Sequence, residues 1–333
     1  MDKILLAHGS GGKLSHELIE GSLLSSLKNP YLEKMDDAAV LEIGGKLAFT
    51  TDSYVISPIF FPGGDIGKLA VCGTVNDLST SGAVPLYLSL SFIIEEGFPV
   101  DDLKKIIESI RQTADEAGVC IVTGDTKVVN RGSADKLFIN TSGIGSIQEG
   151  VNISGSAAKP GDVIIASGGI GEHGMSIMSQ REGLKFAGDL KSDCAPLNGL
   201  VKDMLDVCPN IHSLRDPTRG GLATTLNEMA NQSGVGMVLQ EEAIPVIPPV
   251  QAMCDMLGLD PMHVANEGKL VVILPAEKAD AVLDRMKQNK YGKDAVIIGR
   301  VVDEHPGKVV MKTALGTSRI VRMLTGDLLP RIC

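Results

Sequence analysis

The segment GVNISGSAAKPG, residues 150–161, divides the chain of 333 residues near its middle. Glycine, serine, alanine and proline collect in it, and such a composition favours a connection over a helix or a strand. Apolar residues recur with helical and strand periods on both sides of it. A chain of this length can build two cores. The sequence therefore predicts two domains of mixed helices and strands, residues 1–150 and 151–323, and a flexible tail over residues 324–333.

Helix-like and strand-like segments alternate in the first half of the chain. Asp65 is a good N-cap, and Pro99 and Gly118 are typical of the start and the end of a helix. The predicted helices run over residues 13–27, 65–81 and 100–117, and the predicted strands over 46–51, 86–94, 121–123 and 137–147.

The second half shows the same mixture of apolar periods. The predicted strands run over residues 163–166, 237–240, 270–274, 295–301 and 308–311. Helices are predicted after Gly174 and over residues 197–207, 221–232, 249–257 and 277–288. These elements suggest a second α/β or α+β domain.

Composition excludes several classes of function. The formal charge of −10, the absence of tryptophan and the 3% of aromatic residues argue against a nucleic-acid surface. They allow nucleotides, whose phosphates can bind through metal ions held by carboxylates. No apolar run is long enough to span a membrane, and the N-terminus shows no signal-peptide pattern. The six cysteines include no CxxC pair, so we expect reduced thiols in a cytoplasmic protein.

Aspartates recur in turns and at the ends of apolar segments. One such residue is usually a cap or a turn former. Five such sites together match what magnesium and a triphosphate need, because hard oxygen ligands from several strand ends can converge on a metal that keeps water and phosphate oxygens. The candidate metal ligands are Asp37, which follows Asp36, and Asp52, Asp77, Asp125 and Asp216.

Three glycine-containing stretches could approach an anion. Residues 8–13, HGSGGK, precede the first predicted helix, so backbone N–H groups of Gly11 and Gly12 and the Lys13 ammonium could hold a phosphate. A flexible turn is the alternative. Arg219 and Gly220 would suit a phosphate at another helix start. Residues 168–174 contain a G-x-G-x-x-G string without a convincing acidic strand end about 20 residues later, so they indicate a phosphate or substrate turn or a tight strand–helix connection.

The last residue, Cys333, combines a thiol with the α-carboxylate at the chain end. A thiolate can attack electrophiles or carry groups. Pro330 stiffens the approach, and Leu328, Leu329 and Ile332 are apolar enough to dock. The extended tail could span roughly 20 Å, enough to reach into a cleft. A frayed terminus that happens to end in cysteine is the alternative.

Two further charged residues are candidates for chemistry. Lys127 follows Gly-Asp-Thr, so its ammonium is expected beside the proposed phosphate site. Glu267 stands at the entrance to a predicted strand, where a carboxylate could act as a base. Each taken alone is more often a solvated charge.

Together these segments resemble one family closely, the HypE hydrogenase maturation factors. The resemblance covers essentially the whole chain and rests on HGSGGK (8–13), DDAAV (36–40), TTDS (50–53), VNDLSTSGAVP (75–85), TGDTKV (123–128), SGGIGEHG (167–174), RDPTRGGLATTLNE (215–228), ANEGK (265–269) and the terminal PRIC (330–333). The wider group contains aminoimidazole ribonucleotide synthetase, selenophosphate synthetase and thiamine monophosphate kinase, which all use ATP. The resemblance implies a two-domain, PurM-like α+β fold. In it, an N-terminal sheet pairs with its twin into a barrel across a two-fold dimer, and a mixed-sheet α+β domain follows.

The resemblance also implies an activity. A carbamoyltransferase, HypF, would load a carbamoyl group onto Cys333. ATP-dependent dehydration would then convert this S-carboxamide into a thiocyanate. The cyano group would pass to iron on a HypC–HypD scaffold complex and become a cyanide ligand of the nickel–iron hydrogenase centre.

The matching motifs imply the roles of single residues. Lys127 and Glu267 would be the bases that deprotonate the carboxamide nitrogen. Mg²⁺ would be held by the aspartates named above. The implied ATP contacts are Gly11, Gly12, Lys13, Asp37, Thr51, Asp52, Asn76, Asp77, Asp125, Thr126, Arg219 and Gly220.

Rival functions remain open at this point. Selenophosphate synthetase carries its reactive residue near the N-terminus, whereas the first cysteine here is Cys72. Thiamine monophosphate kinase shares the aspartates but has no reason to end in cysteine. A non-catalytic thiol carrier that merely binds nucleotide is a candidate from another class, and phosphate release would distinguish it from an enzyme.

Overall fold

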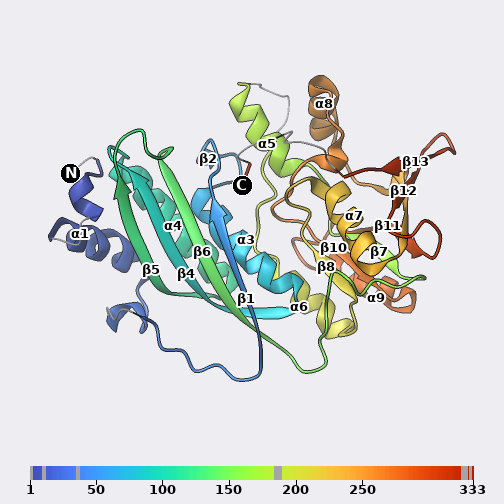
Figure 1. Ribbon diagram of the computed structural model, residues 1–333, viewed down its shortest axis with the longest axis horizontal. Coiled ribbons are helices and arrows are strands. Elements are labelled where there is room, and N and C mark those ends of the chain that lie inside the picture. The colour runs from blue at the N-terminus through green and yellow to red at the C-terminus, as the bar shows by residue number, and fades with distance from the viewer. Residues whose placement is uncertain (1–2, 10–12, 35–37, 184–189, 324–328, 330–331) are drawn as a thin grey trace.

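Two mixed β-sheets, each with its own helices, make up the molecule (Figure 1). The computed structural model describes residues 3–9, 13–34, 38–183, 190–323, 329 and 332–333. The first sheet has the order β1-β6-β4-β5, and the second has the order β13-β12-β9-β11-β7-β10-β8. A third, two-stranded ribbon joins β2 (Phe60–Phe61) to β3 (Gly64–Asp65).

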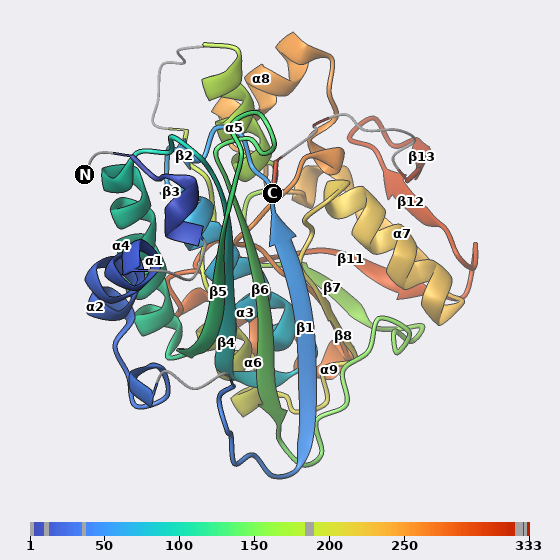
Figure 2. The ribbon, with the colours of Figure 1, turned by 60° about the vertical axis from the view of Figure 1, so that its left-hand side comes forward.

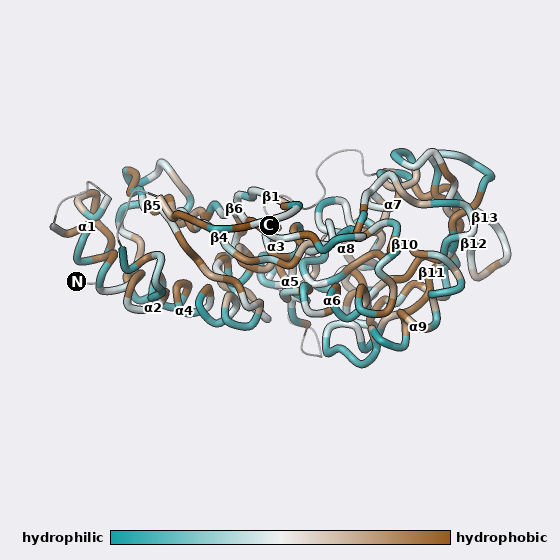
Figure 3. The backbone as a smooth tube through the Cα atoms, turned by 90° about the horizontal axis from the view of Figure 1, so that it is seen from below, coloured by the Kyte–Doolittle hydropathy of each residue, from teal (hydrophilic) through white to brown (hydrophobic). Residues whose placement is uncertain are grey.

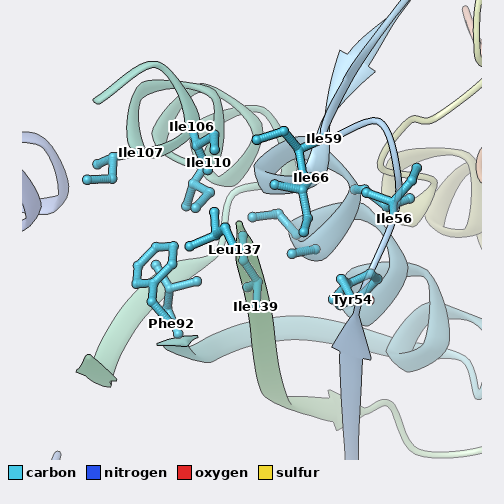
Figure 4. Packing of buried hydrophobic residues seen from close by; sticks show 14 of the residues in the cluster. Tyr54, Ile56, Ile59, Ile66, Phe92, Ile106, Ile107, Ile110, Leu137 and Ile139 are labelled. Carbon is cyan, nitrogen blue, oxygen red and sulfur yellow. The ribbon is translucent and has the colours of Figure 1, made fainter. Parts of the chain in front are cut away.

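The first sheet is built from β1 (Lys46–Tyr54), β6 (Leu137–Ile147), β4 (Ala83–Glu95) and β5 (Cys120–Val129). Only the β4–β5 pair is parallel. One face of the sheet is covered by α3 (Ile66–Thr80) and α4 (Val100–Ala117) (Figure 2). Figure 4 shows the core between them, where Ile106 and Ile110 of α4 meet Leu137 and Ile139 of β6.

The other face of the first sheet is open. Its exposed side chains are partly apolar: Leu47 is 45%, Phe49 70%, Val84 40% and Ile93 43% exposed. Such a face is unusual for a sheet that has no partner.

The N-terminal helices lie next to the edge strand β5 (Figure 2). The predicted helix 13–27 is a continuous helical run, divided into α1 (Lys13–Leu18), a π-helical turn (Ile19–Leu24) and α2 (Ser25–Leu27). Two 3-10 turns, Leu6–Gly9 and Leu32–Lys34, flank it.

The second sheet is formed by β7 (Val163–Ala166), β8 (Ser213–Arg215), β9 (Gly236–Gln240), β10 (Val271–Leu274), β11 (Val296–Val302), β12 (Val309–Lys312) and β13 (Ser318–Val321). Helix α7 (Gly221–Ser233) packs on one face of this sheet. Helices α6 (Asn198–Val207) and α9 (Ala276–Lys287) pack on the other face. The strands supply buried apolar residues to both cores, which is visible as hydrophobic colour along β10 and β11 in Figure 3.

Two further helices, α5 (Glu172–Arg181) and α8 (Pro248–Leu257), share a small apolar cluster beside this sheet. Further 3-10 turns cover Glu241–Ala243 and Pro261–His263. In the described part of the chain, no helix combines the length and the apolarity that crossing a membrane would require.

Most predicted elements are confirmed, α4 among them: it follows Pro99 and ends before a left-handed Gly118. Asp65 is the N-cap of α3 and accepts hydrogen bonds from the backbone of Gly67 and Lys68. Strand β8, the edge strand β13 and the β2–β3 ribbon are not predicted. β8 has only 3 residues, and three of the four residues of β13 are exposed, so neither carries a clear apolar period.

The two sheets meet along α3. The Asn76 side chain of α3 donates to the backbone oxygens of Ala195 and Glu267 and accepts from the N–H of Leu197. The backbone N–H of Ser192 donates to the Pro62 carbonyl at 2.8 Å. These bonds tie the loops of the second part to the first part, and they define the seam at which the candidate site lies.

Candidate active site

A groove of about 770 Å³ runs along the seam between the two parts of the chain. Its wall is formed by β1, by the C-terminal half of α3 and by the connection from β8 to α7. We call it the seam groove. Five charged residues line it: Asp77, Arg215, Asp216, Arg219 and Glu228.

Asp52 and Asp77 form a carboxylate pair, of which Asp77 lines the seam groove. Asp52 lies on the helix-covered face of β1, and Thr50 on the same face donates to Asp77 Oδ2 at 2.9 Å. Burial raises the pKa of Asp52 to about 6, and the neighbouring Asp77 carboxylate adds to the shift. Asp52 Oδ2 is buried without any hydrogen-bond partner. A buried, unpartnered oxygen beside a second carboxylate is suited to bind a cation.

Asp216 follows β8 and faces the same pair. Burial raises its pKa to about 7, with a further contribution from Asp77. The next residues start α7 through two glycines in left-handed conformations, Gly220 (φ 73°) and Gly221 (φ 60°). A Cβ on Gly221 would lie 2.6 Å from the Val264 carbonyl oxygen, so this tight start requires glycine.

These carboxylates fit a magnesium ion that is shared with a phosphate chain. Within the described ranges, no three His, Cys, Asp or Glu side chains are grouped so that they alone could hold a metal ion. Mg²⁺ usually binds through one or two carboxylates together with water and phosphate oxygens. Asp52 and Asp77 supply such a pair, and the unpartnered Asp52 oxygen is a ready ligand.

The chain end is docked at the seam. Ile332 is 4% exposed and belongs to the core of the first part. An oxygen of the Cys333 α-carboxylate accepts a hydrogen bond from the Val55 N–H at 3.3 Å, just beyond the tip of β1 (Figure 2). Burial raises the pKa of the Cys333 thiol to about 11. The charge of Glu267 adds to this shift, and Arg219 opposes it. Both side chains therefore lie close to the thiol. The burial of Ile332 and the hydrogen bond from Val55 show that the frayed-terminus alternative is wrong for these two residues.

Glu267 is a buried carboxyl group beside the Cys333 thiol. It is 3% exposed, and its Oε1 has no hydrogen-bond partner. Burial, with the Cys194 thiol next in effect, raises its pKa well above the ordinary value. Its backbone N–H donates to Asp193 Oδ1 at 3.1 Å, and its carbonyl accepts from Asn76. The alternative of a solvated charge at a strand edge is therefore wrong for Glu267.

Asn76 is predicted from the sequence as an ATP contact, but it does not line the seam groove. It is 1% exposed, and its amide already bonds to the backbone of Ala195, Leu197 and Glu267. Its side chain positions the loop that carries Glu267. Thr51 also lies away from the carboxylates, on the open face of the sheet, where it accepts a hydrogen bond from Ser142. The threonine that contacts Asp77 is its neighbour, Thr50.

Asp125, Thr126 and Lys127 lie on β5, at the opposite edge of the sheet from β1. Three strand-to-strand steps of about 4.8 Å separate the edges by roughly 14 Å. Lys127 pairs in register with the exposed Ile93, on the open face, and its Nζ lies 3.0 Å from Asp125 Oδ1. Within one chain, these residues do not meet the carboxylates of the seam groove.

The remaining predicted contacts lie near the N-terminus. Gly11, Gly12 and Asp37 fall outside the described residues, and Lys13 is described only as the first residue of α1. A cavity of about 310 Å³ lies beside this region, between the N-terminal helical run and β5, and Asp125, Thr126 and Lys127 line it.

The sequence reasoning misses the residues that hold the site together. His173 contacts the tail at Ile332, Ser192 contacts His173, and Asp193 accepts from the Glu267 N–H. The Asn266 side chain bonds to the Gly171 N–H and to the Pro217 and Val264 carbonyls. The 168–174 stretch is a tight strand–helix connection: Gly171 is left-handed, and a Cβ on Gly174 would lie 2.5 Å from Val264. The only sequence signal for His173 is its place at a helix start after three glycines.

Comparison with known proteins identifies the family. The family profile described as "AIR synthase related protein, N-terminal domain" matches residues 35–147, and the one described as "AIR synthase related protein, C-terminal domain" matches residues 159–312. The chain is 54% identical to carbamoyl dehydratase HypE of Azotobacter vinelandii, over 98% of this chain and 96% of that protein.

Solved structures agree with the sequence comparison. A structure of hydrogenase maturation protein HypE in complex with ATP has a TM-score of 0.96 and 52% identity, covering 99% of each chain. A structure of a HypE–HypF complex has a TM-score of 0.82 and 52% identity, covering 94% of this chain and 100% of that chain. The two mixed sheets are thus the two halves of the PurM-like α+β fold, and the chain belongs to the HypE family of carbamoyl dehydratases.

Proposed function

We propose that this chain uses ATP to dehydrate an S-carboxamide on its own Cys333 to a thiocyanate, which supplies the cyanide ligand of a nickel–iron hydrogenase. The observation that carries this proposal is the position of Cys333 beside the buried Glu267 and Arg219, at a groove with paired carboxylates. A thiamine monophosphate kinase-like enzyme does not need a terminal thiol at that place. The carboxylate pair argues against a non-catalytic thiol carrier that merely binds nucleotide, and phosphate release separates such a carrier from the enzyme.

The seam groove would hold magnesium and ATP. Asp52 and Asp77 would hold Mg²⁺, with Asp216 close by, and the ion would offset phosphate charge. Arg219 and the backbone at the start of α7 would bind phosphate oxygens, since helix N-termini attract anions. The structure of a HypE relative in complex with ATP supports nucleotide binding by this fold.

The chemistry follows from the leaving group. The carboxamide oxygen attacks the γ-phosphorus of ATP, and ADP leaves. The oxygen, a poor leaving group by itself, is thereby converted into a phosphate, which is a good one. Cleavage of the C–O bond then releases phosphate. The nitrogen gives up both of its protons in the sequence, and C≡N forms on sulfur.

Glu267 is suited to one of these proton transfers. In the structure it is buried close to the Cys333 thiol, and this burial raises its pKa, which favours the protonated form. It becomes a base only after it ionises, which the positive charges of Arg219 and a bound Mg²⁺ would favour. A proton acceptor poised in this way suits a step that occurs only when ATP is bound.

Lys127 would act from a second subunit. The partly apolar open face of the first sheet, with Phe49 70% exposed, fits a dimer in which two such sheets close into a barrel. Closure around a two-fold axis can place β5 of one subunit beside β1 of the other. Asp125, Thr126 and Lys127 of one subunit would then complete the site that holds Cys333 of its partner. Gly11, Gly12, Lys13 and Asp37 would contribute further ATP contacts.

Mixed dimers test the reaction and the shared site together. Lys127→Ala and Cys333→Ala chains, each with its own affinity tag, are co-expressed, and doubly tagged dimers are isolated. They are incubated with HypF, carbamoyl phosphate and ATP, and the mass of the C-terminal peptide is followed for the loss of one water.

If the site is shared, each mixed dimer has one complete site and shows about half of the parent activity per dimer, whereas both single-variant dimers are inactive. Inactive mixed dimers would contradict the shared site. A parent protein that releases no phosphate and forms no thiocyanate would contradict the activity itself.

The partners follow from the same reaction. We infer that HypF loads Cys333, and the complex of a HypE relative with HypF supports this pairing. A HypC–HypD scaffold would receive the cyano group. Both steps would take place in the cytoplasm.

A further inference from the structure

His173 is buried next to the chain end. It lies in the first turn of α5, it is fully inaccessible to solvent, and its ring meets Phe61 edge-on with ring centroids 5.6 Å apart. Nε2 lies 2.8 Å from the backbone oxygen of Ile332, and Nδ1 lies 2.7 Å from Ser192 Oγ. Both ring nitrogens therefore have a partner, and one partner belongs to the tail.

The partners of His173 determine where its proton sits. A carbonyl oxygen can only accept, so Nε2 must carry the hydrogen and donate it to Ile332. In the neutral ring Nδ1 then accepts from the Ser192 hydroxyl. That hydroxyl oxygen in turn accepts from the Cys194 N–H at 3.1 Å, which keeps its own hydrogen directed at the ring. Burial lowers the pKa of His173, in agreement with a neutral ring.

This hydrogen bond acts on the residue before the reactive cysteine. The Ile332 carbonyl is held by His173 of the second part, and the Cys333 α-carboxylate is held by Val55 of the first part. The backbone is therefore held on both sides of the Cys333 nitrogen, which keeps the thiol near Glu267 and Arg219. Positioning of this kind matters because a small misplacement of a reacting atom slows a reaction strongly.

We propose that His173 is a positioning residue that latches the tail into the active site. The Nε2–H of His173 holds the Ile332 carbonyl, Ser192 selects the tautomer that can do so, and together they set the fraction of time that Cys333 spends docked. The inference rests on the proposed function, because docking matters only if Cys333 reacts in this site. The latch can nonetheless be measured without the reaction.

The reactivity of the Cys333 thiol reports docking directly. A docked thiol is partly buried and has a raised pKa, whereas a released one is exposed and ionises more readily, so an alkylating reagent such as N-ethylmaleimide attacks mainly the released form. Loss of the hydrogen bond from His173 removes its net stabilisation and leaves the buried Ile332 carbonyl without a partner. Together these two effects should lower the docked fraction about tenfold.

The experiment compares variants of the full-length protein by following alkylation of each cysteine peptide with mass spectrometry. His173→Ala should raise the alkylation rate of Cys333 about tenfold and leave that of the buried Cys72 unchanged. His173→Gln, whose amide nitrogen comes near the place of Nε2, should restore slow alkylation to within about threefold of the parent. Ser192→Ala keeps the imidazole but frees its tautomer, so an intermediate rate is expected.

His212→Ala is the matched control. His212 is likewise a buried histidine, 7% exposed, but it pairs with Asp162 at 2.8 Å in the second part, and no hydrogen bond joins it to the described tail residues. The His212→Ala substitution should leave the alkylation rate of Cys333 unchanged. The latch is refuted if folded His173→Ala protein alkylates Cys333 at the parent rate, or if Cys72 becomes reactive in parallel, which would show general loosening. If His173→Ala does not fold, Ser192→Ala and His173→Gln decide in the same assay.

A second readout separates the latch from the proposed function. His173→Ala should keep the ATP affinity of the parent and lower the dehydration rate of the loaded tail about tenfold, and His173→Gln should recover most of it. Faster alkylation in His173→Ala combined with an inactive parent enzyme would leave the latch intact and contradict the activity. An unchanged alkylation rate in an active parent would contradict the latch alone.

Discussion

Replacement of Asp52 by asparagine is expected to change two properties of the protein in opposite directions. In the nucleotide-free protein, an ionised Asp52 is half buried, faces the Asp77 carboxylate and has one oxygen without a partner. Asparagine removes that charge and keeps the shape of the side chain. The same change removes a ligand of the proposed magnesium site. We therefore expect a more stable protein that binds Mg²⁺–ATP more weakly.

The size of the stability gain follows from the pKa. The pKa of Asp52 rises from 3.8 to about 6, and each unit corresponds to about 1.4 kcal/mol. The upper limit is thus about 3 kcal/mol. Since Asp52 as a whole is only partly buried, solvent screening reduces this to about 1–2 kcal/mol. A domain of about 150 residues then gains about 2–8 °C in Tm.

The pH dependence has a defined sign. The folded state holds the Asp52 proton more tightly than the unfolded state, so the parent protein loses stability as the pH rises from about 4 to about 6. Asparagine does not titrate. The advantage of the variant is therefore largest near pH 8 and disappears near pH 4.

The assay measures urea unfolding of parent and Asp52→Asn protein at pH 8 and at the lowest pH at which both stay folded, with calorimetry of Mg²⁺–ATP binding at pH 8. Asp303→Asn, at an exposed aspartate remote from the groove, is the control for removal of one negative charge. An Asp52→Asn protein that is less stable than the parent at pH 8, or that binds Mg²⁺–ATP with unchanged affinity, would refute the reasoning.

Three further outcomes are expected. Cys333→Ala should abolish thiocyanate formation and keep ATP affinity, and calorimetry that shows lost ATP binding would count against a tail that serves the chemistry alone. Glu267→Gln should still bind ATP and accept a carbamoyl group, but it should dehydrate about 10²–10⁴-fold more slowly, because a general base contributes that much; a parent-like rate in mass spectrometry would exclude it as the base. Since burial raises the pKa of Asp52 to about 6 and that of Asp216 to about 7, Mg²⁺–ATP should bind more weakly as the pH falls from 8 to 6 and should release protons on binding. Calorimetry in two buffers of different ionisation enthalpy measures this release, and a heat that does not depend on the buffer would contradict it.

Helix boundaries in this chain can be predicted because their signals are local. Proline before α4, glycine after it and an aspartate at the N-cap of α3 act within a few residues of themselves. Strand β13 escapes prediction because it is a short, mostly exposed edge. Its existence depends on pairing with β12, which no local pattern records.

The candidate site could be predicted less completely. Asp52, Asp77 and Asp216 come together beside the seam groove. Asn76 belongs to the same sequence motif as Asp77, but its side chain is buried and bonds to the backbone of the second part. One helical step of about 100° separates the two side chains, and this decides between groove and core. Alternation along β1 separates Thr51 from Asp52 in the same way.

The sequence by itself determined which reactive groups this protein has: a terminal thiol, a set of carboxylates near strand ends, and a lysine and a glutamate in short motifs that mark the family. These are properties of residue type and spacing, so they can be read without a fold. Tertiary structure alone decided which groups meet. The docking of Ile332 against His173, the burial that raises the pKa of Glu267, and the separation of Lys127 from Cys333 by the width of a sheet all depend on contacts between residues far apart in the chain. Such contacts form only when register and domain packing are complete, because no short segment contains both partners.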